Sequence, residues 1–293
     1  MRVLGLLLIV AFLVLVERNV LRLVQVRKRP NTVGVYRIAQ TVMDRIKLLL
    51  KEIVYVGSAQ FIFFSISPVV CFILSILSWL FVPVPFILYF SKYSILITLF
   101  LSSLLVYPVL WARWRSRSIF SLLRRVRAVA QIISYEVVMG LFLIIFLVLF
   151  RHPCWEGFLY YEFTGTISCI ILFLFFIWIR VITAELNRSP FDLVERESEL
   201  VSGYNVEYSG YRFTLLFLAE YMNIWLIGFI TAVIFVRRNI FLQFIIASIV
   251  VLLGLYIRSI VPRFKFTDLI MLTWKVYLPI TLVILSLILI LVL

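Results

Sequence analysis

Eight runs of predominantly apolar residues alternate with polar segments along this chain. Each run is about 20 residues long, which is the length that spans ~30 Å of hydrocarbon as an α-helix. Lipid offers no water to backbone groups, so a chain built from such runs forms helices. We therefore predict an all-α polytopic membrane protein, a single transmembrane domain over residues 1–293. Its transmembrane helices are predicted at roughly 3–23, 60–82, 92–111, 128–150, 165–183, 213–236, 240–261 and 273–293.

The polar segments differ strongly between the two sides of the membrane. The long ones are loops at about 17–58, 112–127, 184–212 and 262–272, and 23 of the 28 lysines and arginines lie in them or at their edges. Because cations accumulate on the cytosol-equivalent side, these loops are predicted on the matrix side if the protein is mitochondrial. Both termini then lie on the opposite side. The first run continues into polar sequence without a small-residue cleavage site, so we expect it to remain as the first helix.

Composition narrows the function classes. A mean hydropathy of +1.14 excludes an ordinary soluble domain. The net charge of +14 is explained by topology, so we expect no nucleic-acid partner. Three separated cysteines and a single histidine are too few for an iron–sulfur cluster, a haem or a typical zinc site. We expect this chain to bind no cofactor or metal of its own.

Two carboxylates fall inside apolar runs. Glu136 lies about eight residues into the fourth predicted helix, and Glu220 lies at a similar depth in the sixth. A charged side chain facing lipid is costly, so both are expected to face the bundle interior or a hydrated cavity. With Glu185 near the end of the fifth helix, they indicate a buried acidic path. The alternative is a structural role, with each carboxylate paired to an arginine or tyrosine.

The segment from Ala184 to Tyr221 holds seven of the chain's 14 carboxylates. Within it, Ser189-Pro190 suits the start of a short helix. Asp192, Glu195 and Glu199 would share one face of that helix, with Arg188 and Arg196 near enough to pair with them. A solvated acidic loop is the alternative, although the apolar residues between the charges argue against it.

The first long loop contains an amphipathic stretch. Between Val42 and Glu52, the apolar residues 42, 46, 49 and 50 share one helical stripe, and Asp44, Lys47 and Lys51 lie on another face. Two interpretations are open: a helix lying on anionic lipid, or the wall of a cavity that opens at membrane level.

A set of short motifs occurs in a fixed order along the chain. These are Glu17-Arg18, Gln25-Val26-Arg27, Pro30-Asn31, Gln40 through Asp44 to Lys51-Glu52, Arg127-Ala128-Val129-Ala130-Gln131, Ser134-Tyr135-Glu136-Val137, Ala184-Glu185, Asn187-Arg188, Pro190-Phe191-Asp192-Leu193, Glu197-Ser198-Glu199-Leu200, Ala219-Glu220-Tyr221, Pro262-Arg263-Phe264 and Trp274-Lys275. Together they resemble chain 1 of NADH–ubiquinone oxidoreductase, the membrane subunit of respiratory complex I that forms the quinone pocket. The resemblance covers nearly the whole chain.

The resemblance implies a core subunit of a proton-translocating enzyme that holds no redox centre itself. Ubiquinone would be the substrate, while FMN, NADH and iron–sulfur clusters would be bound by partner subunits. The implied partners are other complex I membrane subunits, the hydrophilic quinone-site and terminal-cluster subunits, and the lipid bilayer, cardiolipin included. The implied location is the mitochondrial inner membrane, with both termini on the intermembrane-space side.

The resemblance also assigns site residues. The quinone chamber would be lined by Glu17, Arg18, Arg27, Asp44, Lys47, Arg188, Phe191, Asp192, Glu195, Glu197 and Glu199. The carboxylates that couple quinone reduction to proton pumping would be Glu136, Glu185, Glu207 and Glu220. Two alternatives are the membrane anchor of an energy-converting hydrogenase and, from another class, a secondary ion transporter. The absence of visible sequence repeats counts against the transporter.

Six arginines depart from the family pattern by replacing glycine. They are Arg22, Arg29, Arg37, Arg113, Arg124 and Arg196. Either the arginines are genuine and extend to the membrane surface, or the gene has been translated with the wrong codon table, since some animal mitochondrial codes read AGA and AGG as glycine. We favour the second explanation, which the codons at these positions decide.

Overall fold

The computed structural model describes residues 2–25, 38–52, 61–83, 91–114, 119–160, 165–185, 208–236, 239–261 and 264–292. Within these ranges the chain is helical, with turns between helices and no strand. In chain order the helices are α1 (Arg2–Val24), α2 (Ile38–Leu50), α3 (Phe61–Leu80), α4 (Ser94–Leu104), α5 (Val106–Trp114), α6 (Ile119–Phe150), α7 (Trp155–Tyr160), α8 (Gly165–Glu185), α9 (Gly210–Phe235), α10 (Ile240–Ile260), α11 (Phe266–Leu272), the π-helix η3 (Thr273–Tyr277) and α12 (Leu278–Val292).

The prediction of an all-α polytopic membrane protein is confirmed. Among the described residues, seven helical segments are long and apolar enough to cross a membrane. They correspond to seven of the eight predicted helices. The remaining one, predicted at 165–183, coincides with α8, a helix of 21 residues in which the apolar segment Phe173–Ala184 is described in full.

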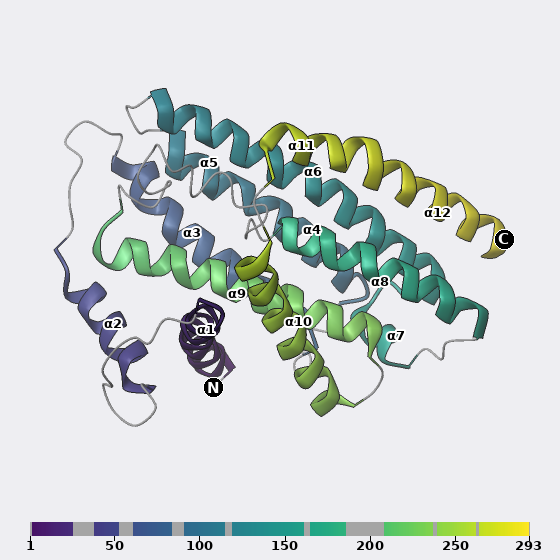
Figure 1. Ribbon diagram of the computed structural model, residues 1–293, viewed down its shortest axis with the longest axis horizontal. Coiled ribbons are helices and arrows are strands. Elements are labelled where there is room, and N and C mark those ends of the chain that lie inside the picture. The colour runs from purple at the N-terminus through teal and green to yellow at the C-terminus, as the bar shows by residue number, and fades with distance from the viewer. Residues whose placement is uncertain are drawn as a thin grey trace.

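Helix α9 lies at the centre of the bundle. It packs along α3 on one side and α10 on another, while α1 and α2 contact it near its beginning. In Figure 1, α1 is seen almost end-on where α9 runs across the view, so these two helices cross steeply. Helix α6 packs on α5, α8 and α12 in the other half of the bundle. As a result, 67% of the most apolar stretch of α9 is buried, against 22% of that of α10.

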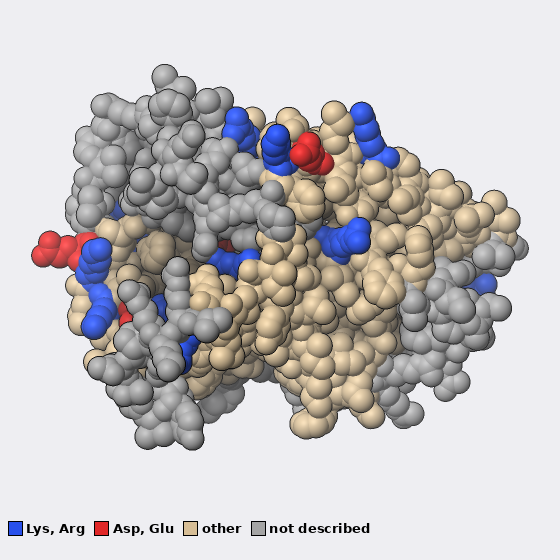
Figure 2. Space-filling model, viewed as in Figure 1, with Lys and Arg blue, Asp and Glu red and all other residues tan. Residues whose placement is uncertain are grey.

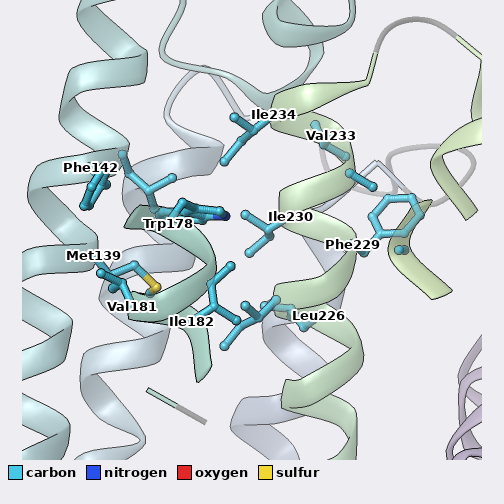
Figure 3. Packing of buried hydrophobic residues seen from close by; sticks show 14 of the residues in the cluster. Met139, Phe142, Trp178, Val181, Ile182, Leu226, Phe229, Ile230, Val233 and Ile234 are labelled. Carbon is cyan, nitrogen blue, oxygen red and sulfur yellow. The ribbon is translucent and has the colours of Figure 1, made fainter. Parts of the chain in front are cut away.

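The core between the two halves is built from large side chains. Trp178 of α8 is fully buried and lies between α6 and α9, as Figure 3 shows. Its ring meets those of Phe142 and Phe146 edge-on, at centroid distances of 5.8 and 6.2 Å. Such edge-on pairs stabilise beyond simple burial of their surface. Ile230 of α9 points toward Trp178 from the other side (Figure 3), so α8 joins α6 to the central helix.

Proline residues explain the interruptions of helices within the membrane. Pro108 has no N–H, and its ring crowds the carbonyl of Leu104, which is where α4 ends and α5 begins. In the last predicted span, Pro279 follows η3, and the N–H of Leu278 bonds the carbonyl of Thr273, five residues back. A local π-helical turn of this kind satisfies backbone groups that a proline releases.

Pro68 has a different consequence. In α3 it leaves the carbonyl of Phe64 without its helical donor. The hydroxyl of Tyr208, just before α9, donates to that carbonyl at 3.2 Å and lies 3.0 Å from the Ser67 hydroxyl. The Tyr208 and Phe64 rings are stacked with centroids 4.1 Å apart. The segment that leads into α9 is therefore fixed against α3.

Two helices begin earlier than the apolar pattern indicates. Helix α6 starts at Ile119, inside the loop predicted at 112–127, and α11 starts at Phe266, inside the loop predicted at 262–272. A hydropathy pattern locates the apolar part of a helix, whereas a helix continues into polar sequence wherever its backbone bonds are retained. The two predicted loops are shorter by these turns.

Candidate functional site

The candidate site lies where α1, α2, α9 and α10 meet. Helix α2 is amphipathic, as predicted, and its polar face, not its apolar face, packs on the bundle. The apolar face points away from the bundle and is exposed: Val42, Met43, Ile46, Leu49 and Leu50. The face that packs on α1 and α9 is the one with Thr41, Asp44, Arg45 and Leu48. In a soluble protein the apolar face would be turned inward, so this orientation indicates a helix that presents its apolar face to lipid.

An ion pair joins α1 to α2. Arg18 donates to the Asp44 carboxylate over 2.6 Å. Their side chains are 54% and 35% exposed, so the pair contributes about 0–1 kcal/mol to stability. Its main effect is to fix the orientation of α2 relative to α1. On the face seen in Figure 2, most of the described surface belongs to uncharged residues, and the charged side chains are scattered, mainly over its left and upper parts.

A second ion pair is buried and joins three helices. Arg258 of α10 donates to Glu17 of α1, and both side chains are only 8% exposed. The Tyr221 hydroxyl of α9 donates to the other oxygen of the same carboxylate over 2.5 Å. A carboxylate in this position is satisfied by a cation and a hydroxyl together, which is what an interior charge requires.

Arg45 lies beside these pairs on the inward face of α2. Its guanidinium sits over the ring of Phe217 at 4.9 Å from the centroid. Burial lowers the pKa of Arg45, and nearby Arg18 lowers it further, against the opposing influence of Tyr221 and Asp44. Phe213, Phe217 and Tyr221 follow one another along the same face of α9, with centroid distances of 6.1 and 4.4 Å. This face combines aromatic rings with positive charge.

Two of the predicted coupling carboxylates are described in full. Glu136 of α6 is partly buried, and one of its oxygens lies 3.5 Å from the Ser102 hydroxyl of α4. Glu220 of α9 is also partly buried, next to Ala219, whose carbonyl lies 3.5 Å from the Ser75 hydroxyl of α3. Glu136 thus faces α4 from α6, whereas Glu220 belongs to the part of α9 that packs on α3. Both side chains are intermediate in exposure, and their facing the interior stays a prediction.

The remaining predicted site residues differ in how far the structure describes them. Lys47 of α2 is exposed and lies beside the inward face. Glu185 is the last residue of α8, and its side chain lies outside the described part of the chain. The others lie outside the described residues altogether: Arg27, Arg188, Phe191, Asp192, Glu195, Glu197, Glu199 and Glu207. The structure thus brings together Glu17, Arg18 and Asp44 from the predicted chamber.

Sequence reasoning missed three members of this site. Arg258 and Arg45 are two of the 23 loop cations, and Tyr221 belongs to one of the family motifs, but no sequence pattern assigns any of them to the site. A usable signal existed for Arg258, because it lies within an apolar helix two residues from its end, where a buried cation needs an acidic partner. No pattern in the sequence indicates which carboxylate that partner is.

The chemistry of these side chains suits an uncharged ring that carries polar oxygens. Aromatic side chains offer flat apolar surface, and the guanidinium groups offer hydrogen-bond donors in a site of low polarity. Among the described residues, no group of three or more histidine, cysteine, aspartate or glutamate side chains is placed to hold a metal ion.

Comparison with known proteins places the chain in a family. The family model described as NADH dehydrogenase matches residues 1–289. NADH-ubiquinone oxidoreductase chain 1 of Aedes aegypti is 41% identical over 278 residues, covering 93% of this chain and 88% of the relative. The proteins of the same name from Branchiostoma lanceolatum and Lampetra fluviatilis are each 40% identical, covering 94% and 97% of this chain and 89% and 92% of theirs. The chain belongs to the NADH dehydrogenase family.

Proposed function

We propose that this chain, a core membrane subunit of NADH:ubiquinone oxidoreductase, forms the access chamber for ubiquinone and the acidic path that couples quinone reduction to proton pumping. The relatives named as chain 1 of that enzyme support the subunit role over a hydrogenase anchor or a transporter. The observation that carries the chamber is the meeting of the buried Glu17–Arg258–Tyr221 network with the polar, inward face of α2.

The chamber is proposed to open between α2 and α9 at the membrane surface. The apolar face of α2 would lie in lipid, so a lipid-soluble quinone could pass from the bilayer to the polar face without crossing water. The aromatic residues of α9 would contact its ring. The complex would reduce quinone to quinol with two electrons from a partner subunit and two protons.

Charge develops on the quinone oxygens during that reduction. Arg18 and Arg258 are already held by carboxylates in fixed positions, so their fields need little reorganisation when the charge appears. A change of protonation at the coupling carboxylates would then favour one of two conformations of the membrane arm. Glu136, Glu185, Glu207 and Glu220 are the proposed members of this path, and the inner mitochondrial membrane is its proposed location.

The partners follow from the same proposal. This chain would contact the hydrophilic subunits that carry the quinone site and the terminal iron–sulfur cluster, other membrane subunits, and lipid, cardiolipin included. FMN and the iron–sulfur clusters would be bound by those partners, with NADH oxidised there. Purification with flavin and iron–sulfur subunits would support the proposal, whereas ion transport by the isolated chain in liposomes would contradict it.

The acidic path is tested by replacing one carboxylate at a time in the assembled complex. Glu136→Gln and Glu220→Gln remove a titratable group while keeping its size. We expect each variant to lose most quinone-coupled NADH oxidation and proton pumping, measured together in sealed membrane vesicles. Glu156→Gln on α7, on the other side of the membrane, is the matched control and should keep both activities. Normal pumping in both Glu136→Gln and Glu220→Gln would refute the path.

A further inference from the structure

The two terminal nitrogens of the Arg45 guanidinium lack a hydrogen-bond acceptor among the described residues. Both terminal nitrogens are closed off from solvent, and no acceptor in the chain as described bonds either one. Arg18 and Arg258, its neighbours in the site, each have a carboxylate. A guanidinium carries five N–H donors, and a buried donor without an acceptor costs its full desolvation penalty.

The nearby acidic groups already serve other cations. Asp44 precedes Arg45 in α2, but its carboxylate accepts from Arg18. Glu17 accepts from both Arg258 and Tyr221. Within the part of the chain that the structure describes, these carboxylates leave no acceptor for Arg45, so we look for one in a bound ligand.

The surroundings of Arg45 indicate the chemistry of that acceptor. One face of the guanidinium lies over Phe217, which belongs to the aromatic series along α9. A flat ring can stack on these side chains while its carbonyl oxygen accepts from the guanidinium. A phospholipid phosphate is the other common acceptor at a membrane surface, but Arg18, more than half exposed, is better placed for it.

We propose that Arg45 positions the quinone headgroup between α2 and α9 by donating a hydrogen bond to one of its carbonyl oxygens. This inference rests on the proposed access chamber and identifies a residue that holds the quinone headgroup there, whereas Arg18 and Arg258 would stabilise the charge that develops on it. The role is one of positioning, so Arg45 should affect binding of quinone more than turnover.

The first experiment establishes the identity of residue 45 in the mature protein. Trypsin cleaves after arginine, so peptide mass spectrometry of the purified complex should show cleavage between residues 45 and 46. A residue other than arginine at this position would overturn the proposal and would add position 45 to the six at which a misread codon is suspected.

The second experiment separates binding from turnover in the assembled complex. Arg45→Leu removes the donors, Arg45→Lys keeps one charged donor, and Lys51→Leu removes an exposed cation from the same segment as a control. For Arg45→Leu we expect the KM for a short-chain quinone to rise about tenfold, the effect of losing one hydrogen bond. The kcat should change less than about twofold, since turnover does not involve Arg45. Arg45→Lys should give an intermediate KM, and Lys51→Leu the original one.

Stability gives an independent measurement. Because Arg45→Leu removes an unpaired buried charge, the complex should denature at the same or a higher temperature than the unaltered complex. An unchanged KM in Arg45→Leu, with quinone-coupled activity intact, overturns the role of Arg45 and leaves the chamber proposal standing. Loss of co-purified anionic phospholipid with an unchanged KM would assign Arg45 to a lipid phosphate. Absence of quinone-coupled activity in the unaltered complex would overturn the chamber itself.

Discussion

Glu17 accepts hydrogen bonds from two side chains that lie 204 and 241 positions further along the chain. One carboxylate therefore connects α1, α9 and α10 at the site. Its two partners differ in kind: Arg258 supplies a compensating charge, and Tyr221 supplies a neutral donor. This division predicts different costs when each partner is removed.

We expect Glu17→Gln to destabilise the folded chain by about 3–5 kcal/mol, because it leaves Arg258 buried without a counter-charge. Tyr221→Phe should cost less, about 1.5–3 kcal/mol, the value of one hydrogen bond to a charged group. The double variant Glu17→Leu with Arg258→Leu should recover part of the stability lost in Glu17→Gln. Thermal denaturation of the purified complex measures all three.

The exposed pair of Arg18 and Asp44 provides the matched control. Asp44→Asn breaks an ion pair of the same chemical type, at the same junction of α1 with its neighbours, but in contact with solvent. Its cost should stay within about 1 kcal/mol. If Glu17→Gln and Asp44→Asn proved equally mild, the buried network would not hold the three helices together.

Six residues are arginine at positions where the family has glycine. Arg22 lies in the last turn of α1 and is partly buried. The side chains of Arg113 and Arg124, and the whole of Arg29, Arg37 and Arg196, lie outside the described part of the structure. The codons at these positions, or the same peptide masses that identify residue 45, decide between a genuine arginine and a misread glycine.

At the scale of helices, the sequence was a good guide to where they lie and a poor guide to how they are interrupted. Apolar length identifies a span because only a helix satisfies its own backbone in lipid. The break at Leu105 and the π-helical turn before Pro279 depend on how the backbone rearranges near a proline that supplies no N–H donor. Those are questions of three-dimensional packing.

For the site, the sequence indicated some of the residues but not how the helix α2 is oriented. Glu17, Arg18 and Asp44 were assigned to one place by resemblance, and the structure joins α1 to α2 through two of them. The inward orientation of the polar face of α2 could not be derived from periodicity, because a helical stripe gives two faces without saying which one packs on the bundle. The environment, lipid or water, decides that, and hydropathy alone does not record it.

Packing between α9 and α10 depends on Gly228. A Cβ atom at this position would lie 2.7 Å from Cγ2 of Val251 and 3.4 Å from the carbonyl oxygen of Ala247. Small residues allow this kind of close helix approach in membranes. We expect Gly228→Ala to destabilise the chain by about 1–3 kcal/mol, the usual cost of overpacking. Denaturation temperature in detergent is the appropriate measurement.

Gly254 on α10 is the control for that substitution. It lines a pocket between α8, α9 and α10, and a Cβ there would meet no atom within 4 Å. Gly254→Ala should therefore be neutral, or stabilising by up to about 1 kcal/mol through its helix propensity. Adding Val251→Ala to Gly228→Ala should relieve the clash. An equal loss of stability in Gly228→Ala and Gly254→Ala would show that helix contact is not the cause.

In the whole molecule, the distribution of charge and the position of the apolar helices point to the same orientation in the membrane. The polar inward face of α2 and the buried network of Glu17 lie at the end of the bundle that we propose faces the matrix, which is the side predicted for the cation-rich loops. Quinone and the hydrophilic partners would approach this end from different directions, the quinone from lipid and the partners from water. The orientation of the chain thus determines whether the proposed chamber can meet its electron donor.

Orientation is tested by labelling single cysteines from each side of the membrane. Lys51 and Lys92 are both exposed and are predicted on opposite sides, the matrix and the intermembrane space. In a background without Cys71, Cys154 and Cys169, an impermeant maleimide should label Lys51→Cys in vesicles whose matrix face is outward. It should label Lys92→Cys in mitochondria stripped of their outer membrane. A permeant maleimide should label both sites in both preparations, which separates a membrane barrier from burial against partner subunits. The reverse pattern would place the cation-rich loops and α2 on the intermembrane-space side, away from the subunits that reduce quinone, and the proposed chamber could not function there.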